Sequence, residues 1–360
     1  MKKYYCIAAA VLCAMTACTK NELDVPEVNE AIVFQVANYM AQTKADGPVA
    51  YSTSNSFGTY AWYDAENGGA QHQAFMENEK VSHNGTNWAP AQTYYWPKTG
   101  NVDFISYSPY AASPWITIMN DKTSACPDTT ATIIKGSIAN CAGTEDYMFS
   151  DKALNYNANA GEYKINSTGG VPTLFHHALS KISVDIKANQ LTVGTTTWKV
   201  TIDSLSFTGI NVNGEVSFKL SSYSGTGAQQ ATWAPVGENN IWTSSNPVDA
   251  IKAQSSKTTL TTSFQNTLNS YTVVPQALKG KKLHMEFTVE AKNTSTGKVY
   301  STEKIVKDFD LADDFNSDDY WKINTHTKYQ ITVCPNDGDK VVLFDPAVVE
   351  WDAASPAKQS

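Results

Sequence analysis

In the stretch Leu179-Ser180-Lys181-Ile182-Ser183-Val184-Asp185-Ile186, apolar and polar residues alternate from Ile182 onward, so that the apolar side chains of Ile182, Val184 and Ile186 share one face. This alternation predicts a β-strand with a buried side. Similar short runs recur between residues 31 and 344, separated by Gly, Asn, Asp and Pro, and no helical periodicity of useful length interrupts them. Many short strand-like runs separated by turn residues favour antiparallel sandwiches over folds in which strands and helices alternate. We therefore expect an all-β chain.

A linker-like stretch, Asn166-Ser167-Thr168-Gly169-Gly170, divides the strand-like runs into two similar halves. A chain of 360 residues is long enough for two domains that each bury a core. The sequence therefore predicts an N-terminal β-sandwich domain at residues 31–170 and a C-terminal β-sandwich domain at residues 171–360.

The 27 basic residues are all lysines, and they face 35 Asp and Glu residues, for a net charge of −8. Without arginine the chain has no guanidinium fork to clamp phosphate or carboxylate. Its negative field repels nucleic acid. We therefore expect no nucleic-acid partner.

The first residues have the pattern of an export signal. Lys2 and Lys3 precede the apolar run Ile7–Met15, which is too short to span a bilayer, and Thr16-Ala17-Cys18 closes it. This spacing resembles a bacterial lipobox, in which the cysteine receives the lipid. We predict a signal peptide at residues 1–17, lipid attachment at Cys18 and a lipidated tether at residues 18–30, holding the protein at a membrane. The alternative is an ordinary signal peptide cut near Ala17, with Cys18 unmodified.

Three cysteines remain beyond Cys18. Cys126 and Cys141 flank a Thr- and Ala-rich loop, and closing about 15 residues with a disulfide would contribute roughly 3 kcal/mol. Both the disulfide and two separate thiols stay open at this point. Cys334 follows Ile331-Thr332-Val333 and is expected to be a small apolar strand residue.

The motifs of common enzymes are missing. The sequence contains no G-x-S-x-G, G-x-x-x-x-G-K, G-x-G-x-x-G, H-E-x-x-H or C-x-x-C. His176 and His177 are neighbours in an expected strand, so they point to opposite faces and do not jointly hold a metal. The acidic run Asp308–Asp319 lacks the glycine and the final glutamate of a calcium loop. We expect no catalysis, no metal and no cofactor.

One alternative function comes from the aromatic residues. Rings exposed side by side offer flat faces on which sugars stack. Such a platform would make the chain a surface lipoprotein that binds glycan. The candidate residues are Trp62, Tyr63, Trp88, Tyr94, Tyr95 and Trp96.

A further pattern is a set of segments that follow one another in a fixed order along the chain. They are the lipobox, Ala31–Val36, Thr43–Ala45, Tyr95–Pro97, Val102–Pro109, Asp146–Met148, Phe175–Ile182 and Val274–Gln276. In this order they resemble the fimbrillin (Mfa-like) proteins of Bacteroides and its relatives. The resemblance covers residues 30 to 351, and the polar flank Thr19–Asp24 is similar to that of surface-exposed lipoproteins of these bacteria.

The resemblance implies two transthyretin-like β-sandwich domains in tandem. It also implies a surface-exposed lipoprotein of the outer membrane, without catalysis, that acts as stalk, tip or anchor of fimbriae used in adhesion. Its partners would be other fimbrial subunits, joined by strand donation. Carried onto this chain, the removable first strand is Ala31–Asn38 and the processing site lies at Lys44 and Ala45.

The missing arginine bears on this processing, because the family's best-known cleavage is arginine-specific. Either a protease that accepts lysine cuts at Lys44, or the chain stays uncut as a tethered anchor or tip. The donor strand is also open. The apolar stretch Val341–Trp351 is either donated to another subunit or completes the second sandwich.

Overall fold

The computed structural model describes residues 30–38, 49–64, 73–118, 133–141, 143, 145–157, 170–220, 229–231, 233–235, 242–243, 247–248, 251–254, 256–313, 319–337 and 342–349. Every regular element in these ranges is a β-strand, which confirms the all-β prediction. None of them contains a helix long and apolar enough to cross a membrane.

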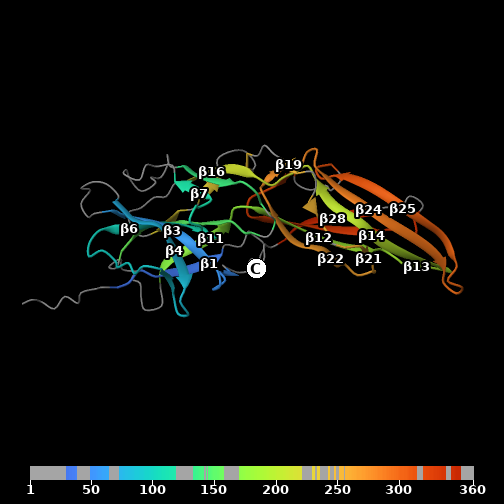
Figure 1. The fold of residues 1–360 in the computed structure, drawn as a ribbon, viewed down its shortest axis with the longest axis horizontal. Coiled ribbons are helices and arrows are strands. Elements are labelled where there is room, and N and C mark those ends of the chain that lie inside the picture. The colour runs from blue at the N-terminus through green and yellow to red at the C-terminus, as the bar shows by residue number, and fades with distance from the viewer. Residues whose placement is uncertain are drawn as a thin grey trace, which may run out of the picture.

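The strands gather at two ends of an elongated molecule (Figure 1). At the N-terminal end, strands pair in the order β6-β3-β4-β5-β1-β11-β9, and β9 pairs again with β6, so that they close into a ring. Strands β10 and β17 extend this sheet from β6, and β2 lies beside β1. Their bounds are β1 Phe34–Asn38, β2 Val49–Ala50, β3 Ser56–Asp64, β4 Gln73–His83, β5 Trp88–Pro90, β6 Asn101–Ser108, β9 Met148–Ser150, β10 Lys152–Tyr156, β11 Val171–His177 and β17 Gln229–Ala231.

A smaller sheet lies at the same end, with its strands in the order β18-β16-β8-β7. One hydrophobic core joins it to the ring, because Ile116 and Phe218 from the small sheet cluster with Ile105 and Leu154 from β6 and β10. The bounds are β7 Ile116–Ile118, β8 Ile133–Ile138, β16 Gly214–Leu220 and β18 Trp233–Pro235.

The C-terminal end is a sandwich of two sheets around one core. Ile182, Val184 and Ile186 are fully buried in that core together with Phe207 and Phe287 of the facing sheet, as the alternating sequence predicts. One sheet has the order β22-β12-β27-β28, and the other has β13-β14-β24-β25 with β20 and β21 beside β14. The bounds are β12 Ser180–Ala188, β13 Thr192–Val193, β14 Thr196–Thr208, β20 Ile251–Lys252, β21 Thr258–Thr259, β22 Gln265–Val273, β24 Lys282–Asn293, β25 Val299–Asp310, β27 Thr325–Val333 and β28 Val342–Val349.

Two short two-stranded sheets complete the paired strands of the described residues. They are β15 Ile210–Asn211 with β19 Pro247–Val248, and β23 Gln276–Ala277 with β26 Tyr320–Trp321.

The sequence predicted antiparallel sheets, and the structure differs from that prediction in two strand pairs. Most pairs are antiparallel, but β1 pairs with β11 and β12 pairs with β27 in parallel. A parallel pair needs a long connection, and more than a hundred residues separate the two strands in each case. Periodicity along one strand does not reveal such a distant partner.

The pairing also crosses the expected domain boundary after residue 170. Strand β11 begins at Val171 and joins the N-terminal ring through β1. Further along the chain, β16 pairs with β8 and β17 pairs with β10. Strands from both sides of residue 170 therefore complete the N-terminal sheets, and these strands lie together at one end of Figure 1.

The C-terminal core contains one polar contact whose loss is measurable. Tyr329 is fully buried, and its hydroxyl accepts a hydrogen bond from Trp321 Nε1 at 2.8 Å. In Tyr329→Phe the indole N–H stays buried without an acceptor, so we expect a loss of about 1–3 kcal/mol of unfolding free energy. Urea unfolding followed by tryptophan fluorescence measures it. Tyr300→Phe, on the exposed face of β25, is the control and is expected to change stability by less than about 0.5 kcal/mol. Equal stability of both variants would contradict this account of the core.

Candidate functional site

Strand β1, which lies in the predicted removable segment Ala31–Asn38, closes the N-terminal ring. It pairs in parallel with β11 over Phe34–Asn38, and Phe34 also pairs with Trp88 of β5. Just before the strand, Ile32 N donates to Tyr94 O at 2.8 Å. Because β5 and β11 do not pair with each other, β1 is the element that joins them.

The apolar side chains of this segment point into the ring. Ile32 and Phe34 are 1% and 4% exposed, whereas Gln35 is exposed. The Phe34 ring meets Phe57 and Phe104 edge to face, at centroid distances of 5.6 and 5.7 Å. Such pairs add to the stabilisation that burial alone supplies. The first strand is therefore a packed part of the core.

The interior of the ring draws apolar residues from every strand that closes it. Tyr51 stacks on Phe175 of β11 at 5.0 Å, and Trp88 of β5 lies 5.8 Å from Phe57 of β3. All four belong to the cluster that contains Phe34. Without β1, these rings would line an open apolar slot between β5 and β11.

Gly170 explains how closely β1 lies against β11. A Cβ atom at this position would lie 2.6 Å from the Phe34 carbonyl carbon and 2.6 Å from Val33 O. Both contacts are to backbone, so a side chain here would force the strands apart. Gly170, which ends the linker-like stretch of the sequence, thus permits a close strand contact.

The aromatic platform expected from the sequence is not formed. Trp88 and Trp96 are 7% and 4% exposed inside the ring, and Trp62 lies in the other N-terminal core. Tyr95 is the most exposed of the set, at 52%. Alternation along strands sends these rings to different faces, so the six residues do not make one sugar-binding surface.

The two histidines have separate carboxylate partners. His176 Nε2 lies 2.9 Å from Asp151 Oδ1, and His177 Nδ1 lies 2.9 Å from Asp146 Oδ1. The sequence indicated the opposite directions of the histidines, but not the two aspartates, which are brought close by strand pairing. Within the described residues no group of three or more His, Cys, Asp or Glu is placed to hold a metal ion.

Several predicted site residues lie outside the described ranges, namely Cys18, Lys44, Ala45 and Cys126. Lipid attachment and processing therefore stay predictions. Cys141 is a buried thiol that donates to Thr272 O at 3.0 Å, and burial raises its pKa. Because Cys126 lies outside the described residues, the disulfide and the two separate thiols both stay open. Cys334 is buried, as expected, but it lies directly after the end of β27 at Val333 and not within the strand.

The predicted donor stretch contains strand β28, which pairs with β27 along its whole length, from Val342 to Val349. Val342 packs against the C-terminal core. In this structure the strand therefore completes the second sandwich, which is one of the two alternatives that the sequence left open.

The arrangement of strands is similar to that of one solved fimbrial protein. A fimbrial protein from Bacteroides vulgatus superposes with a TM-score of 0.55 at 14% identity, covering 89% of this chain and 99% of its own. The fimbrial anchor protein Mfa2 from Porphyromonas gingivalis matches at a TM-score of 0.30 and 12% identity, covering 89% and 98%. At such identities only the first likeness is informative, and it shows a shared fold.

The family follows from the sequence. The model of the fimbrillin-like family (Mfa-like) matches residues 43–351, which is most of the chain. A comparison of the chain with curated proteins found no match. The chain belongs to the fimbrillin-like family. The resemblance deduced from its ordered segments is thereby confirmed, and membership places the chain among fimbrial proteins of the cell surface.

The packing of Phe34 allows a direct test of whether β1 is part of the N-terminal core. Phe34→Ala removes a buried ring with two edge-to-face partners, and we expect it to lower the unfolding free energy by about 3–5 kcal/mol. Gln35→Ala, at the next residue of the same strand, shortens an exposed side chain. We expect it to change the unfolding free energy by less than about 0.5 kcal/mol. Guanidinium unfolding measures both. Similar values for the two variants would mean that β1 is not part of the N-terminal core.

Proposed function

We propose that the chain is a structural subunit of cell-surface fimbriae that assembles by β-strand addition at the slot held by β1. The observation that carries this proposal is the position of β1, which alone joins β5 to β11 and buries Ile32 and Phe34 among aromatic rings. Family membership supports the fimbrial role. The role is structural, and no catalytic step is part of it.

Removal of β1 would create the acceptor for another subunit. Cleavage between Lys44 and Ala45 separates β1 from the rest of the chain, leaving it held only by noncovalent contacts. Its departure exposes the unpaired backbone edges of β5 and β11 and an apolar slot, which is an unfavourable state in water. A strand from a second subunit restores both the hydrogen bonds and the burial.

The N-terminus decides whether the subunit joins a stalk. Lipid on Cys18 holds the uncut protein at the outer membrane, exposed on the surface, because the tether, β1 and the ring are one chain. Lys44 is the only lysine between Lys20 and Lys80, so a protease that accepts lysine has one place to cut between the tether and the second half of β4. Cut chains enter a stalk, and an uncut chain serves as anchor or tip.

The donated strand is the less constrained part of the proposal. Donation of β28 requires it to leave β27, with which it pairs over eight residues. Its far edge has no partner strand in the described sheet, so exchange at this edge leaves the remaining pairs β22-β12-β27 in place. We propose that β28 of one subunit is the donor.

A disulfide lock on β1 tests strand addition. Gln35 and Pro172 are register partners on β1 and β11, and Gln35 is exposed. In the oxidised double variant Gln35→Cys and Pro172→Cys, cleavage at Lys44 by low-dose trypsin should give no SDS-resistant oligomers, because β1 cannot leave. After reduction the ladder should appear, as in the cleaved wild-type chain. Gel electrophoresis without boiling reads the result.

Lys44→Gln is the matched control for cleavage, and it should stay monomeric at the same trypsin dose. A ladder that forms equally with β1 locked and unlocked would refute assembly at this slot. A complete absence of ladders after confirmed loss of β1 would refute strand addition altogether.

Lipid attachment has its own test. Cells expressing the full chain are labelled with a radioactive fatty acid, and we expect label on the wild-type protein and none on Cys18→Ala. Cys13→Ala, inside the signal peptide, is the control and should keep the label. Labelling that persists in Cys18→Ala would remove the proposed anchor.

A further inference from the structure

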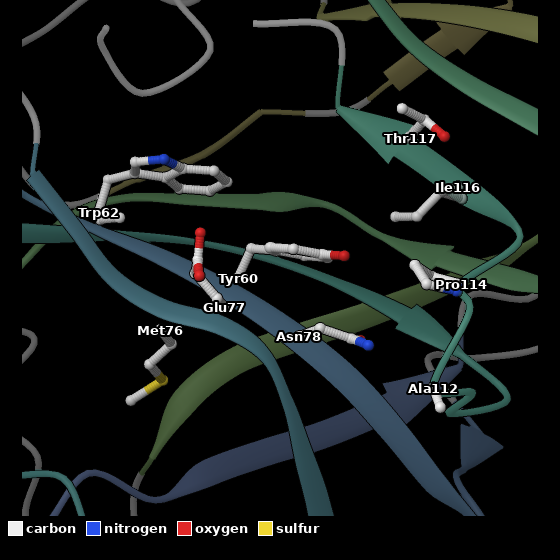
Figure 2. A pocket seen from close by; sticks show the side chains of 10 residues that line it. Tyr60, Trp62, Met76, Glu77, Asn78, Ala112, Pro114, Ile116 and Thr117 are labelled. Atoms are coloured by element: carbon white, nitrogen blue, oxygen red, sulfur yellow. The ribbon is translucent and has the colours of Figure 1, made fainter. Parts of the chain in front are cut away.

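A pocket of about 390 Å³ lies apart from the β1 slot, on the side of the ring that faces the small sheet. Its walls come from β3 and β4 on one side and from residues 112–117 on the other. Figure 2 shows Tyr60 and Trp62 on the first wall, with Ile116 and Thr117 of β7 opposite. The volume is at the small end of the range for ligand sites in proteins, which suits a compact ligand.

Two aromatic rings form one wall. Tyr60 and Trp62 are two residues apart on β3, so they share a face, and their rings stack at 6.3 Å with an interplanar angle of 18°. Trp62 is 8% exposed and Tyr60 is half-buried. Together they offer a flat apolar surface on one wall of the pocket.

Polar side chains from two neighbouring strands also line the pocket. Glu77 and Asn78 of β4 and Thr117 of β7 line the same pocket, and Figure 2 shows Glu77 next to Tyr60. Burial raises the pKa of Tyr60 to about 12, so its hydroxyl keeps its proton at neutral pH and can donate. The pocket thus combines flat rings with a carboxylate, an amide and two hydroxyls.

The backbone at this pocket is unusual. Asn78 has φ of 48°, in the left-handed region, although it lies within β4. The β3–β4 register shifts at the same place, between Thr59 and Ala61, as a bulge does. Asn78 Nδ2 donates to Ala111 O at 3.0 Å, and its Oδ1 accepts from the Tyr107 hydroxyl at 2.5 Å. Strained backbone that neighbours hold in place is concentrated at functional sites in proteins.

The charge of the pocket disfavours anionic ligands. Glu77 is the charged residue among the described residues that line it, and none of these is basic. The chain as a whole has no arginine. An anionic ligand would find no partner here and would be repelled by the carboxylate. Neutral sugars present apolar C–H faces for aromatic rings and hydroxyls for a carboxylate, which matches Tyr60, Trp62 and Glu77.

We propose that this pocket binds a neutral sugar residue at the end of a glycan, stacked against Tyr60 and Trp62 and hydrogen-bonded by Glu77. This function goes beyond assembly and does not depend on it, because the residues differ from those of the β1 slot. It also differs from the platform expected from the sequence, of which only Trp62 lines the pocket. In adhesion, the bound sugar would be part of a glycan on the receptor.

Saturation-transfer NMR on the full mature chain tests the proposal. The probes are the methyl glycosides of glucose, galactose, mannose and N-acetylglucosamine, with N-acetylneuraminic acid as the acidic comparison. We expect transfer to ring protons of at least one neutral glycoside and none to the acid. Glu77→Gln should weaken that binding about tenfold, as expected for the loss of a hydrogen bond to a charged group. Tyr60→Ala should abolish it.

Tyr95→Ala is the matched control, because Tyr95 is an exposed aromatic residue outside the pocket, and it should bind like the wild type. Thermal unfolding followed by circular dichroism establishes that each variant is folded. No transfer to any neutral glycoside, unchanged binding in folded Glu77→Gln and Tyr60→Ala, or stronger binding of the acid would overturn the proposal. Binding should persist in the oxidised Gln35→Cys and Pro172→Cys variant, so failure of sugar binding and failure of assembly are separate results.

Discussion

The N-terminal half of the protein depends on the contact between β1 and β11. Five consecutive residue pairs in parallel register join strands that are more than a hundred residues apart in sequence, and Gly170 allows their backbones to approach. Phe34 packs edge to face against Phe57 and Phe104 in the aromatic interior of the ring. Because β5 and β11 are bridged by β1 alone, the ring is closed by a strand at the N-terminal end of the fold. A strand at the end of the chain is easier to exchange than one in the middle, because it can leave without any other segment passing through the sheet.

This architecture separates three tasks along the molecule. The C-terminal sandwich has its own core around Ile182, Phe207 and Phe287, which contains no residue of β1. The ring holds β1, the strand that we propose is exchanged, and the proposed sugar pocket lies between the ring and the small sheet. Loss of β1 therefore opens one core and leaves the sandwich intact. In the proposed assembly the sandwich would keep its fold while β1 is exchanged, as polymerisation of preformed subunits requires.

Local patterns predicted much of the fold, but not its long-range pairing. The alternation at Ile182, Val184 and Ile186 predicted a strand with a buried face, and all three are buried. The return of β16 to β8, the parallel partners and the burial of Trp88 and Trp96 depend on contacts between distant segments, which a period of two does not encode. For the pocket, the spacing of Tyr60 and Trp62 was a usable signal, since residues two apart share a strand face. The left-handed Asn78 and its hydrogen bonds to Tyr107 and Ala111 had no such signal.

The central claim is that β1 holds the N-terminal ring closed while the C-terminal sandwich stands independently. Hydrogen exchange, measured on the full mature chain and on the chain lacking residues 19–44, tests it most directly. Without β1, amides of β11 at Val171–His177 should lose protection, while those of β14 and β24 in the sandwich should keep it. Unchanged protection of β11, or loss of protection throughout both ends, would contradict the account.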